Sequence, residues 1–373
     1  MNASLAFEVV VALVLQVSLL VLASVWLQKH VRDSRGMCRM WTICFVSILV
    51  LIAVAFLLPH RRVLFLPPSL TSPTLLEIVA WQARLIKGLA VIWLIGIAVS
   101  LIRRAFQCWL LVRFLKQRCV PATESQLAGL PSGWDDSDSQ PAAADRPLRS
   151  LTILVSAEIN GPFCWQLHRP VIVLPQYLVD GDAMHCRHVL LHEWEHLRTN
   201  HPMQHFLQGI CSTLLWFHPA VWVAARDAEL AREFLCDEVA ARRGGRFSDY
   251  LRTLIKIAER CACSPFSATA SGALAFGNRK SSLIRRSERL LELAGRASDD
   301  RAGRPNWAIG GLVLVAILVS QVWLPTNAIA THRSHWSPWP TWTATTLHDF
   351  GVTVRDFETF DERTQMHELL SGN

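Results

Sequence analysis

Four long stretches of the chain consist almost entirely of apolar residues, and polar segments separate them. They cover residues 5–27, 41–58, 88–102 and 307–324, and the only charged side chain inside them is Glu8. A helix of about 20 apolar residues is long enough to cross a bilayer. The pattern therefore predicts four transmembrane helices, three before a long polar segment and one after it. The third stretch is the shortest, so Arg84 and Lys87 at its start have to extend their charged ends to the membrane surface.

The polar segment between the third and fourth stretches has shorter periodicities. Residues 150–156 (SLTILVS) and 170–175 (PVIVLP) are typical of short β-strands. Helical patterns follow at residues 182–199, 202–243, 248–260 and 279–294, and the second is interrupted near His218 and Pro219. Residues 121–149 are rich in Pro, Ser, Ala and Asp and predict a flexible linker. We expect a mostly α membrane protein with an inserted α+β domain.

The distribution of charge supports a membrane protein rather than a nucleic-acid-binding one. Charged residues make up 18% of the chain, against about 25% in typical soluble domains. The net charge is +7, but Lys and Arg cluster beside the apolar stretches. Because such clusters face the cytoplasm, residues 103–306 are predicted to be cytoplasmic, with the N-terminus and the acidic tail outside. We expect a lipid bilayer as a partner and no direct contact with nucleic acid.

The ten cysteines are scattered along the chain and form no C-x-x-C pair. A zinc ribbon or a disulfide framework is therefore not expected. Reduced cysteines that pack in the protein interior are the preferred interpretation.

Residues 192–196 read His-Glu-Trp-Glu-His, a spacing typical of a zinc site on a helix. Positions i and i+4 lie on one helix face, so His192 and His196 can bind one metal ion while Glu193 faces the same cleft. Asp182 is the expected N-cap of this helix. Glu193 is then the general base that takes a proton from the attacking water.

A zinc site with three protein ligands needs one more donor. Residues 232–237 read Arg-Glu-Phe-Leu-Cys-Asp on a later predicted helix, with Glu233 and Asp237 again at i and i+4. Glu233 is the predicted third ligand of a single Zn²⁺. Asp237 is the predicted hydrogen-bond acceptor that orients a ligating histidine. Cys236 is interpreted as a packing residue, because three donors already suffice.

Several neighbouring residues leave alternatives open. Tyr250, His201 and His205 are candidate donors to the oxyanion of the reaction. His185 and His188 share a face with the zinc ligands, but without a carboxylate partner they are interpreted as solvent-facing or supporting histidines. Glu195 is expected to be exposed on its helix, and Trp194 to pack on the domain or at the bilayer surface. Arg285 and Arg286 are expected on a solvated helix face rather than at a self-cleavage point.

The motifs HEWEH at 192–196, WFHPAVW at 216–222 and REFLCDEVA at 232–240 together resemble the BlaR/MecR family of bacterial membrane metallopeptidases. The RPVIVLP run at 169–175 and the SLIRR run at 282–286 resemble the segments that flank the zinc helices of that family. The resemblance covers residues 150–290 and extends to the arrangement of three spans plus one. It implies a zincin-like, gluzincin-type site in which His192, His196 and Glu233 bind zinc, in a bacterial plasma-membrane protein.

The chain departs from the family in two respects. Asn200 stands where an Asp is expected just after the zinc helix. The β-lactam receptors of the family carry a penicillin-binding sensor after the last span, whereas residues 326–373 are a short segment and the sequence has no Ser-x-x-Lys. Covalent sensing of β-lactams is therefore not expected.

Five segments are predicted. They are a three-span region (1–104), a helix extension with a linker (105–149), a zinc metallopeptidase domain (150–295), a basic flank with the fourth span (296–325) and an extracytoplasmic tail (326–373). By resemblance, the substrate is a cytoplasmic regulatory protein such as a winged-helix transcriptional repressor. The two alternatives are a non-catalytic zinc-containing signalling scaffold and a housekeeping membrane protease. The sequence does not indicate an oligomeric state.

Overall fold

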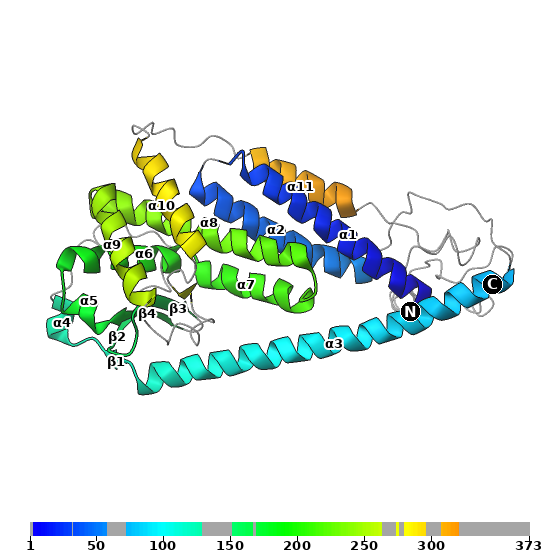
Figure 1. Cartoon of the computed structure of the whole chain (residues 1–373), viewed down its shortest axis with the longest axis horizontal. Helices are drawn as coiled ribbons and strands as arrows, with labels where there is room; N and C mark the ends of the chain where they lie inside the picture. Colours follow the sequence, from blue (N-terminus) through cyan, green and yellow to red (C-terminus); the bar gives the residue numbers. More distant parts are fainter. Residues whose placement is uncertain are drawn as a thin grey trace, which may run out of the picture.

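The computed structural model describes residues 3–31, 33–57, 72–128, 151–166, 169–262, 274–275, 280–295 and 307–320. Its long axis is occupied by apolar helices, and a small sheet with its covering helices lies at one end (Figure 1). The predicted tail at 326–373, the basic flank at 296–306 and most of the predicted linker, 129–149, lie outside the described residues.

Among the described residues, three helices are long and apolar enough to cross a membrane: α1 (Ala3–Gln28), α2 (Ser34–Leu57) and α3 (Ser72–Gln117). The helix α2 begins before its apolar stretch because the Asp33 carboxylate accepts hydrogen bonds from the backbone N–H groups of Arg35 and Gly36. The predicted fourth span corresponds to α11 (Trp307–Ser320), which has 14 described residues. That length spans only about 21 Å, so the fourth crossing stays a prediction.

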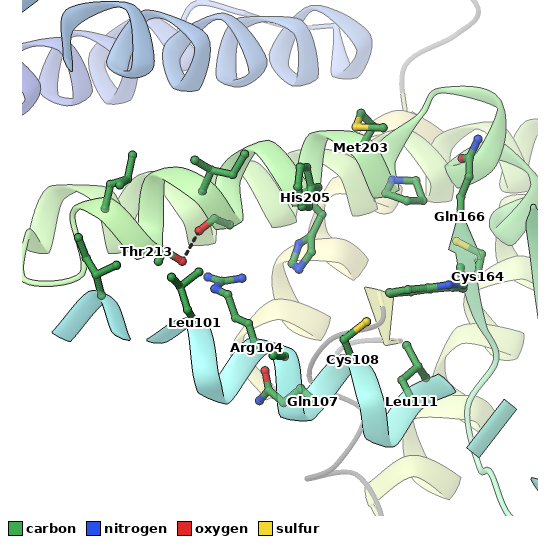
Figure 2. Close-up of a pocket in the computed structure, with 18 residues that line it drawn as sticks. Leu101, Arg104, Gln107, Cys108, Leu111, Cys164, Gln166, Met203, His205 and Thr213 are labelled. Atoms are coloured by element: carbon green, nitrogen blue, oxygen red, sulfur yellow. Dashed lines mark hydrogen bonds between the residues drawn. The ribbon is translucent and has the colours of Figure 1, made fainter. Parts of the chain in front are cut away.

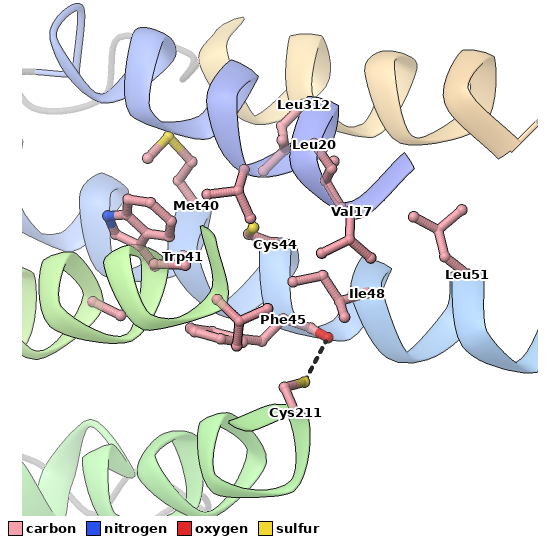
Figure 3. Close-up of a cluster of buried hydrophobic side chains, with 14 of the residues drawn as sticks. Val17, Leu20, Met40, Trp41, Cys44, Phe45, Ile48, Leu51, Cys211 and Leu312 are labelled. Carbon is pink, nitrogen blue, oxygen red and sulfur yellow. Dashed lines mark hydrogen bonds between the residues drawn. The ribbon is translucent and has the colours of Figure 1, made fainter. Parts of the chain in front are cut away.

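A continuous apolar core joins these spans to the helices of the polar segment. Leu20 of α1, Ile48 of α2 and Leu312 of α11 are buried in one cluster with Cys211 and Leu215 of the later helices (Figure 3). The Cys211 thiol donates to the backbone carbonyl of Phe45 at 3.5 Å, across the interface with α2. The predicted metallopeptidase domain is therefore packed directly onto these apolar helices.

The helix α3 is the longest element and lies apart from the other spans for much of its length (Figure 1). Its 46 residues extend about 69 Å, more than twice the hydrocarbon thickness of a bilayer. The same helix therefore continues beyond its apolar stretch as far as the sheet. This continuation agrees with the helix extension predicted after residue 104.

A mixed sheet forms one wall of the domain, with strand order β1-β2-β4-β3-β5. The strands β2 (Thr152–Ser156) and β4 (Pro170–Pro175) are parallel, with Leu154 opposite Val173. The strand β3 (Phe163–Gln166) runs antiparallel to β4 on its other side and was not predicted. Its edge pairs with β5 (Leu274–Ala275), and β1 (Val120–Pro121) pairs with β2.

The start of the predicted linker is ordered, contrary to expectation. Val120 and Pro121 pair with β2, and α4 (Glu124–Ala128) follows. The backbone N–H of Ala122 donates to the carbonyl of Ile153. Pairing with the edge of the sheet overrides the composition that favours a flexible chain.

The remaining helices follow the predicted patterns closely, except for the first, a four-residue helix that was not predicted. They are α5 (Gln176–Val179), α6 (Ala183–Arg198), α7 (His201–Leu214), α8 (Pro219–Gly244), α9 (Phe247–Ala262) and α10 (Lys280–Gly295). One face of α6 packs on the sheet through Val189 and Leu190, which are buried with Ile172 and Leu174. The helix α8 packs along α6, so the two motif-bearing helices face each other.

Candidate metal centre

The helix α6 holds the HEWEH motif in the protein interior. Asp182 is its N-cap, and its side chain accepts a hydrogen bond from the backbone N–H of Met184 at 2.8 Å. This hydrogen bond lowers the pKa of Asp182 below its usual range. The sheet on one side and α8 on the other leave His192 and His196 almost fully buried.

The structure brings His192, His196 and Glu233 together. The Nε2 atoms of the two histidines are 3.2 Å apart, and the Glu233 carboxylate oxygens lie 3.6 Å from Nε2 of His192 and 3.5 Å from Nε2 of His196. Four ligands at about 2.0–2.1 Å in a tetrahedron are separated by about 3.3 Å. The His192 distance is to Oε2 of Glu233 and the His196 distance is to Oε1, and all three separations are close to that value. The three side chains thus lie close enough together for one zinc ion to bind them.

Asp237 of α8 and Tyr250 of α9 contact the Nδ1 side of the His192 ring. Its Nδ1 lies 3.2 Å from Oδ1 of Asp237 and 3.0 Å from the hydroxyl of Tyr250, which itself donates to Asp237 at 2.7 Å. These acceptors favour the tautomer of His192 in which Nδ1 carries the proton. In that tautomer the lone pair of Nε2 is free to bind a metal. Asp237 thus lies where the sequence predicts it.

Burial disfavours a charged His192, but the carboxylates of Asp237 and Glu233 outweigh burial and raise the pKa of His192 to about 9. In the same centre, burial and its cationic neighbours lower the pKa of His196 to about 3. The two rings thus differ: the carboxylates around His192 favour its charged form, whereas the interior around His196 favours the neutral form that can bind a metal.

Arg286 of α10 is a functional residue that the sequence interpretation missed. We expected it on a solvated helix face, but it is 1% exposed and donates to Asp237 at 2.6 and 2.7 Å. A third nitrogen, Nη1, lies 2.9 Å from Oε2 of Glu233. Burial raises the pKa of both carboxyl groups, but this guanidinium outweighs it. The pKa of Glu233 is lowered to about 2, and that of Asp237 is also lowered. Its neighbour Arg285 is exposed, as expected.

His196 is held by a third histidine. Its Nδ1 lies 3.0 Å from Nδ1 of the buried His201, which also lies 3.5 Å from Sγ of Cys236. Burial lowers the pKa of His201 well below its usual value, so His201 is neutral and can accept the Nδ1 proton of His196. His196, His201 and Cys236 also lie close enough together to hold a metal ion. The hydrogen bond between the rings explains this grouping without a second metal.

Neither Tyr250 nor His201 lies where an oxyanion donor is needed. Both contact the Nδ1 atoms, on the side of each ring that faces away from the metal position. Asn200, the departure from the family pattern, occupies a left-handed turn with φ of 54° between α6 and α7. Asn tolerates that conformation better than most residues do.

Glu193 lies beside the proposed ligands, with a side chain that is 1% exposed. Its Oε2 has no hydrogen-bond partner among the described residues. Burial raises the pKa of Glu193 to about 7, against the lowering effect of His192. A carboxylate with a pKa near neutrality is suited to take and return a proton.

The structure corrects the interpretations of Glu195 and His185, and for His188 it agrees with one of the two alternatives. Glu195 is fully buried and accepts hydrogen bonds from Arg198 at 2.7 and 3.0 Å. His185 has a carboxylate partner after all, because its Nδ1 lies 2.9 Å from Oδ2 of Asp182. His188 is fully buried and bonded to the Thr253 hydroxyl at 2.8 Å, so it supports the fold and does not face solvent. Trp194 is buried in the domain, as one of its two interpretations expected.

A cavity of about 610 Å³ lies beside the centre, between α3, α7 and β3 (Figure 2). Most of its lining is apolar, and Arg104 and His205 are its main polar groups. Cys164 in its wall interacts with the Glu193 carboxylate on the other side. His205, the third oxyanion candidate, therefore faces this cavity, which contains neither Glu193 nor the three proposed ligands in its lining.

Comparisons with known proteins identify the family. A family model described as BlaR1 peptidase M56 matches residues 8–288. A relative, the "Regulatory protein BlaR1" of Bacillus licheniformis, is 31% identical over 81 residues. The aligned residues are 21% of this chain and only 13% of that protein's length. Because the family model extends from α1 to α10 and covers well over half of the sequence, this chain belongs to the BlaR1 peptidase M56 family.

Proposed function

We propose that the chain is a zinc-dependent endopeptidase that cleaves a cytoplasmic regulatory protein. The observation that carries the proposal is the convergence of the Nε2 atoms of His192 and His196 with the Glu233 carboxylate, at separations of 3.2–3.6 Å. Membership of a peptidase family supports a reaction at peptide bonds.

In this proposal His192, His196 and Glu233 hold one zinc ion. Zinc in such a site lowers the pKa of a bound water towards about 7 and polarises a carbonyl group. Glu193 accepts the proton of the attacking water through its carboxylate and then donates it to the leaving amine. Asp237 and His201 fix the tautomers of the two ligating rings. Arg286 keeps Glu233 and Asp237 ionised, so that both remain acceptors.

The position of Glu193 favours a catalytic centre over a structural one. A purely structural zinc ion needs no buried carboxylate beside its ligands, and an unpaired Oε2 in the interior costs stability. The scaffold alternative leaves this residue without a role. The housekeeping alternative shares the same centre, and only the identity of the substrate separates it from regulated proteolysis.

The substrate and the topology rest on likeness to relatives. The Bacillus relative is named a regulatory protein, which supports a substrate in signal transduction. We propose a cytoplasmic repressor as that substrate, and four spans with the domain in the cytoplasm. The turn between α1 and α2 lies at the same end as the domain, because Ser34 donates to Glu238 at 2.7 Å and Gln28 to Asp227 at 3.1 Å.

The test uses the full-length protein in lipid nanodiscs. Glu193→Gln is expected to bind one zinc ion per chain, as the wild type does, and to lose peptide hydrolysis by at least about 100-fold, the scale of general-base catalysis. Glu233→Gln is expected to lose zinc as well. Zinc content is measured by mass spectrometry of the metal and cleavage with casein as the probe. Wild-type activity in Glu193→Gln, or full zinc binding without the Glu233 carboxylate, would refute the assignment.

The substrate class needs a separate experiment. Comparison of the proteins in wild-type and Glu193→Gln cells is expected to show one or a few cytoplasmic regulators cleaved only in the wild type. Cleavage of many unrelated membrane proteins would instead favour the housekeeping alternative.

A further inference from the structure

The catalytic region contains a long uncharged stretch that the four predicted spans do not include. No Asp, Glu, Lys or Arg occurs in residues 199–225. The stretch forms α7, the turn at residues 215–218 and the first turns of α8. The helix α7 has 14 residues and extends about 21 Å, which is too short to cross a bilayer.

The α7–α8 hairpin exposes large apolar side chains, and those on α7 line the cavity between α3 and α7. Its exposed large apolar side chains are Met203, Phe206, Ile210, Phe217, Trp222 and Val223. Single exposed apolar residues are common on soluble domains, but six large ones within one uncharged hairpin indicate a surface that contacts something other than water.

Other side chains of the hairpin pack against the apolar helices α1 and α2. Cys211 and Leu215 are buried against α2, and His218 Nε2 lies 3.1 Å from the backbone carbonyl of Val14 in α1 (Figure 3). Val14 is 14 residues, or about 21 Å, along α1 from Gln28 at the catalytic end of that span. The tip of the hairpin thus lies beside the interior of a span, beyond the middle of a hydrocarbon layer about 30 Å thick.

The backbone of the tip is satisfied by protein donors. The carbonyl of Leu214 accepts from the indole N–H of Trp93 in α3 at 2.7 Å, and that of Trp216 accepts from the indole of Trp222 at 2.9 Å. The carbonyl of Leu215 accepts from the backbone N–H of His218 at 2.9 Å. A helix end in water needs no such donors, whereas one in hydrocarbon must find every partner within the protein.

From these contacts we infer that the α7–α8 hairpin is a re-entrant element, inserted among the lipid acyl chains from the catalytic side. Its exposed face continues the apolar surface of α3, and the cavity between α3 and α7 is filled by acyl chains at the same depth. Ile97 and Leu101 line that cavity from the span, and Ile210 and Leu214 line it from the hairpin (Figure 2). The insertion places the helix that carries Glu233 partly within the membrane.

Lipid photolabelling tests this inference without any need for enzyme activity. The full-length protein is reconstituted in nanodiscs of phosphatidylcholine that carries a diazirine in its acyl chain. After illumination, adducts are mapped by mass spectrometry. Residues 206–223 are expected to be labelled at least about tenfold more often than Ile255, Ile284 and Leu291, because acyl chains stay within a layer about 30 Å thick. Those three residues are equally apolar and exposed but lie on α9 and α10.

Labelling of the hairpin that is as rare as on those three residues would overturn the inference. Crosslinks from Phe206 or Trp222 to a second copy or to another protein would overturn it too, since the face would then be a protein interface. A matched pair of variants gives a second measurement. Val223→Lys is expected to lower the unfolding midpoint in nanodiscs by on the order of 5 °C, and Ile255→Lys to leave it unchanged. Equal effects of the two would count against insertion.

Discussion

Arg286 and Asp237 form a buried ion pair 49 positions apart in the sequence, in which Nε and Nη2 of the guanidinium donate to both carboxylate oxygens at 2.7 and 2.6 Å. The pair connects α10 to α8 at the carboxylate that contacts Nδ1 of His192. Because the same guanidinium reaches Glu233, one side chain balances both carboxylates of the centre. The orientation of the metal ligands therefore depends on a helix that contributes no ligand itself.

Removal of this guanidinium should be costly. Arg286→Met leaves Asp237 and Glu233 as buried carboxylates without their cation, and the expected loss is about 3–5 kcal/mol of unfolding free energy. Denaturant unfolding of the zinc-free protein in nanodiscs measures the loss. The control is Arg285→Met, on the exposed side of the same helix. Equal stability of the two variants would contradict the central place of Arg286.

Asp237 should affect zinc affinity more than it affects the fold. Asp237→Asn keeps an oxygen near Nδ1 of His192 but loses the negative charge that favours the Nδ1 tautomer. The expected result is a zinc affinity about 10–100-fold weaker, measured by competition with a chelator. Asp227→Asn on the same helix, where the carboxylate contacts Gln28 and not the centre, serves as the control. An unchanged affinity in Asp237→Asn would show that Tyr250 alone orients the ring.

Asp182 should stabilise the zinc helix through its cap. Asp182→Ala removes the acceptor for the Met184 N–H and is expected to cost about 1 kcal/mol. Hydrogen exchange of the first turn of α6 measures the change, with the exposed Asp180→Ala as the control. The pKa of Asp182 is lowered in the folded protein, so the cap's contribution is present above the unfolded value of 3.8 and is lost as the pH falls below it. The difference between wild type and variant should disappear at low pH.

Gly96 should be essential for the contact between α3 and the hairpin. A Cβ at this position would overlap the ring of Trp216, whose indole N–H donates to the carbonyl of Trp93 at 3.3 Å. Gly96→Val is therefore expected to separate the two helices and to expose the segment around Leu214 to hydrogen exchange. Gly88→Val on the same helix is the control, since nothing lies within 4 Å of the added Cβ. Equal exchange in both variants would place α3 elsewhere in the membrane.

Much of the fold and of the proposed centre could be predicted from local patterns. The apolar stretches predict α1, α2 and α3, the cap predicts the start of α6, and the i,i+4 spacings place His192, His196, Glu233 and Asp237 on facing helices. The family resemblance stated from these motifs is confirmed by the family match. These features are encoded within a few turns of helix, where periodicity is informative.

The remaining features depend on contacts between distant segments. Arg286 and Glu195 are charged, and polarity alone predicts an exposed position, but partners on other turns and helices make their burial favourable. The strand β3 is only four residues long and lacks a clear alternation. The hairpin of α7 and α8 is shorter than a membrane span, so its relation to the bilayer becomes visible only when α1 and α2 are packed against it.

The helix α8 is continuous from Pro219, at the hairpin tip, to Gly244. Glu233 lies 14 residues from Pro219, about 21 Å along the same rigid rod. No loop separates the hairpin tip from Glu233. A tilt or shift of the bundle formed by α1, α2 and α11 would therefore move this proposed metal ligand relative to the two on α6. Under the proposed function, a change in the membrane helices would therefore reach the centre as a displacement of the Glu233 carboxylate.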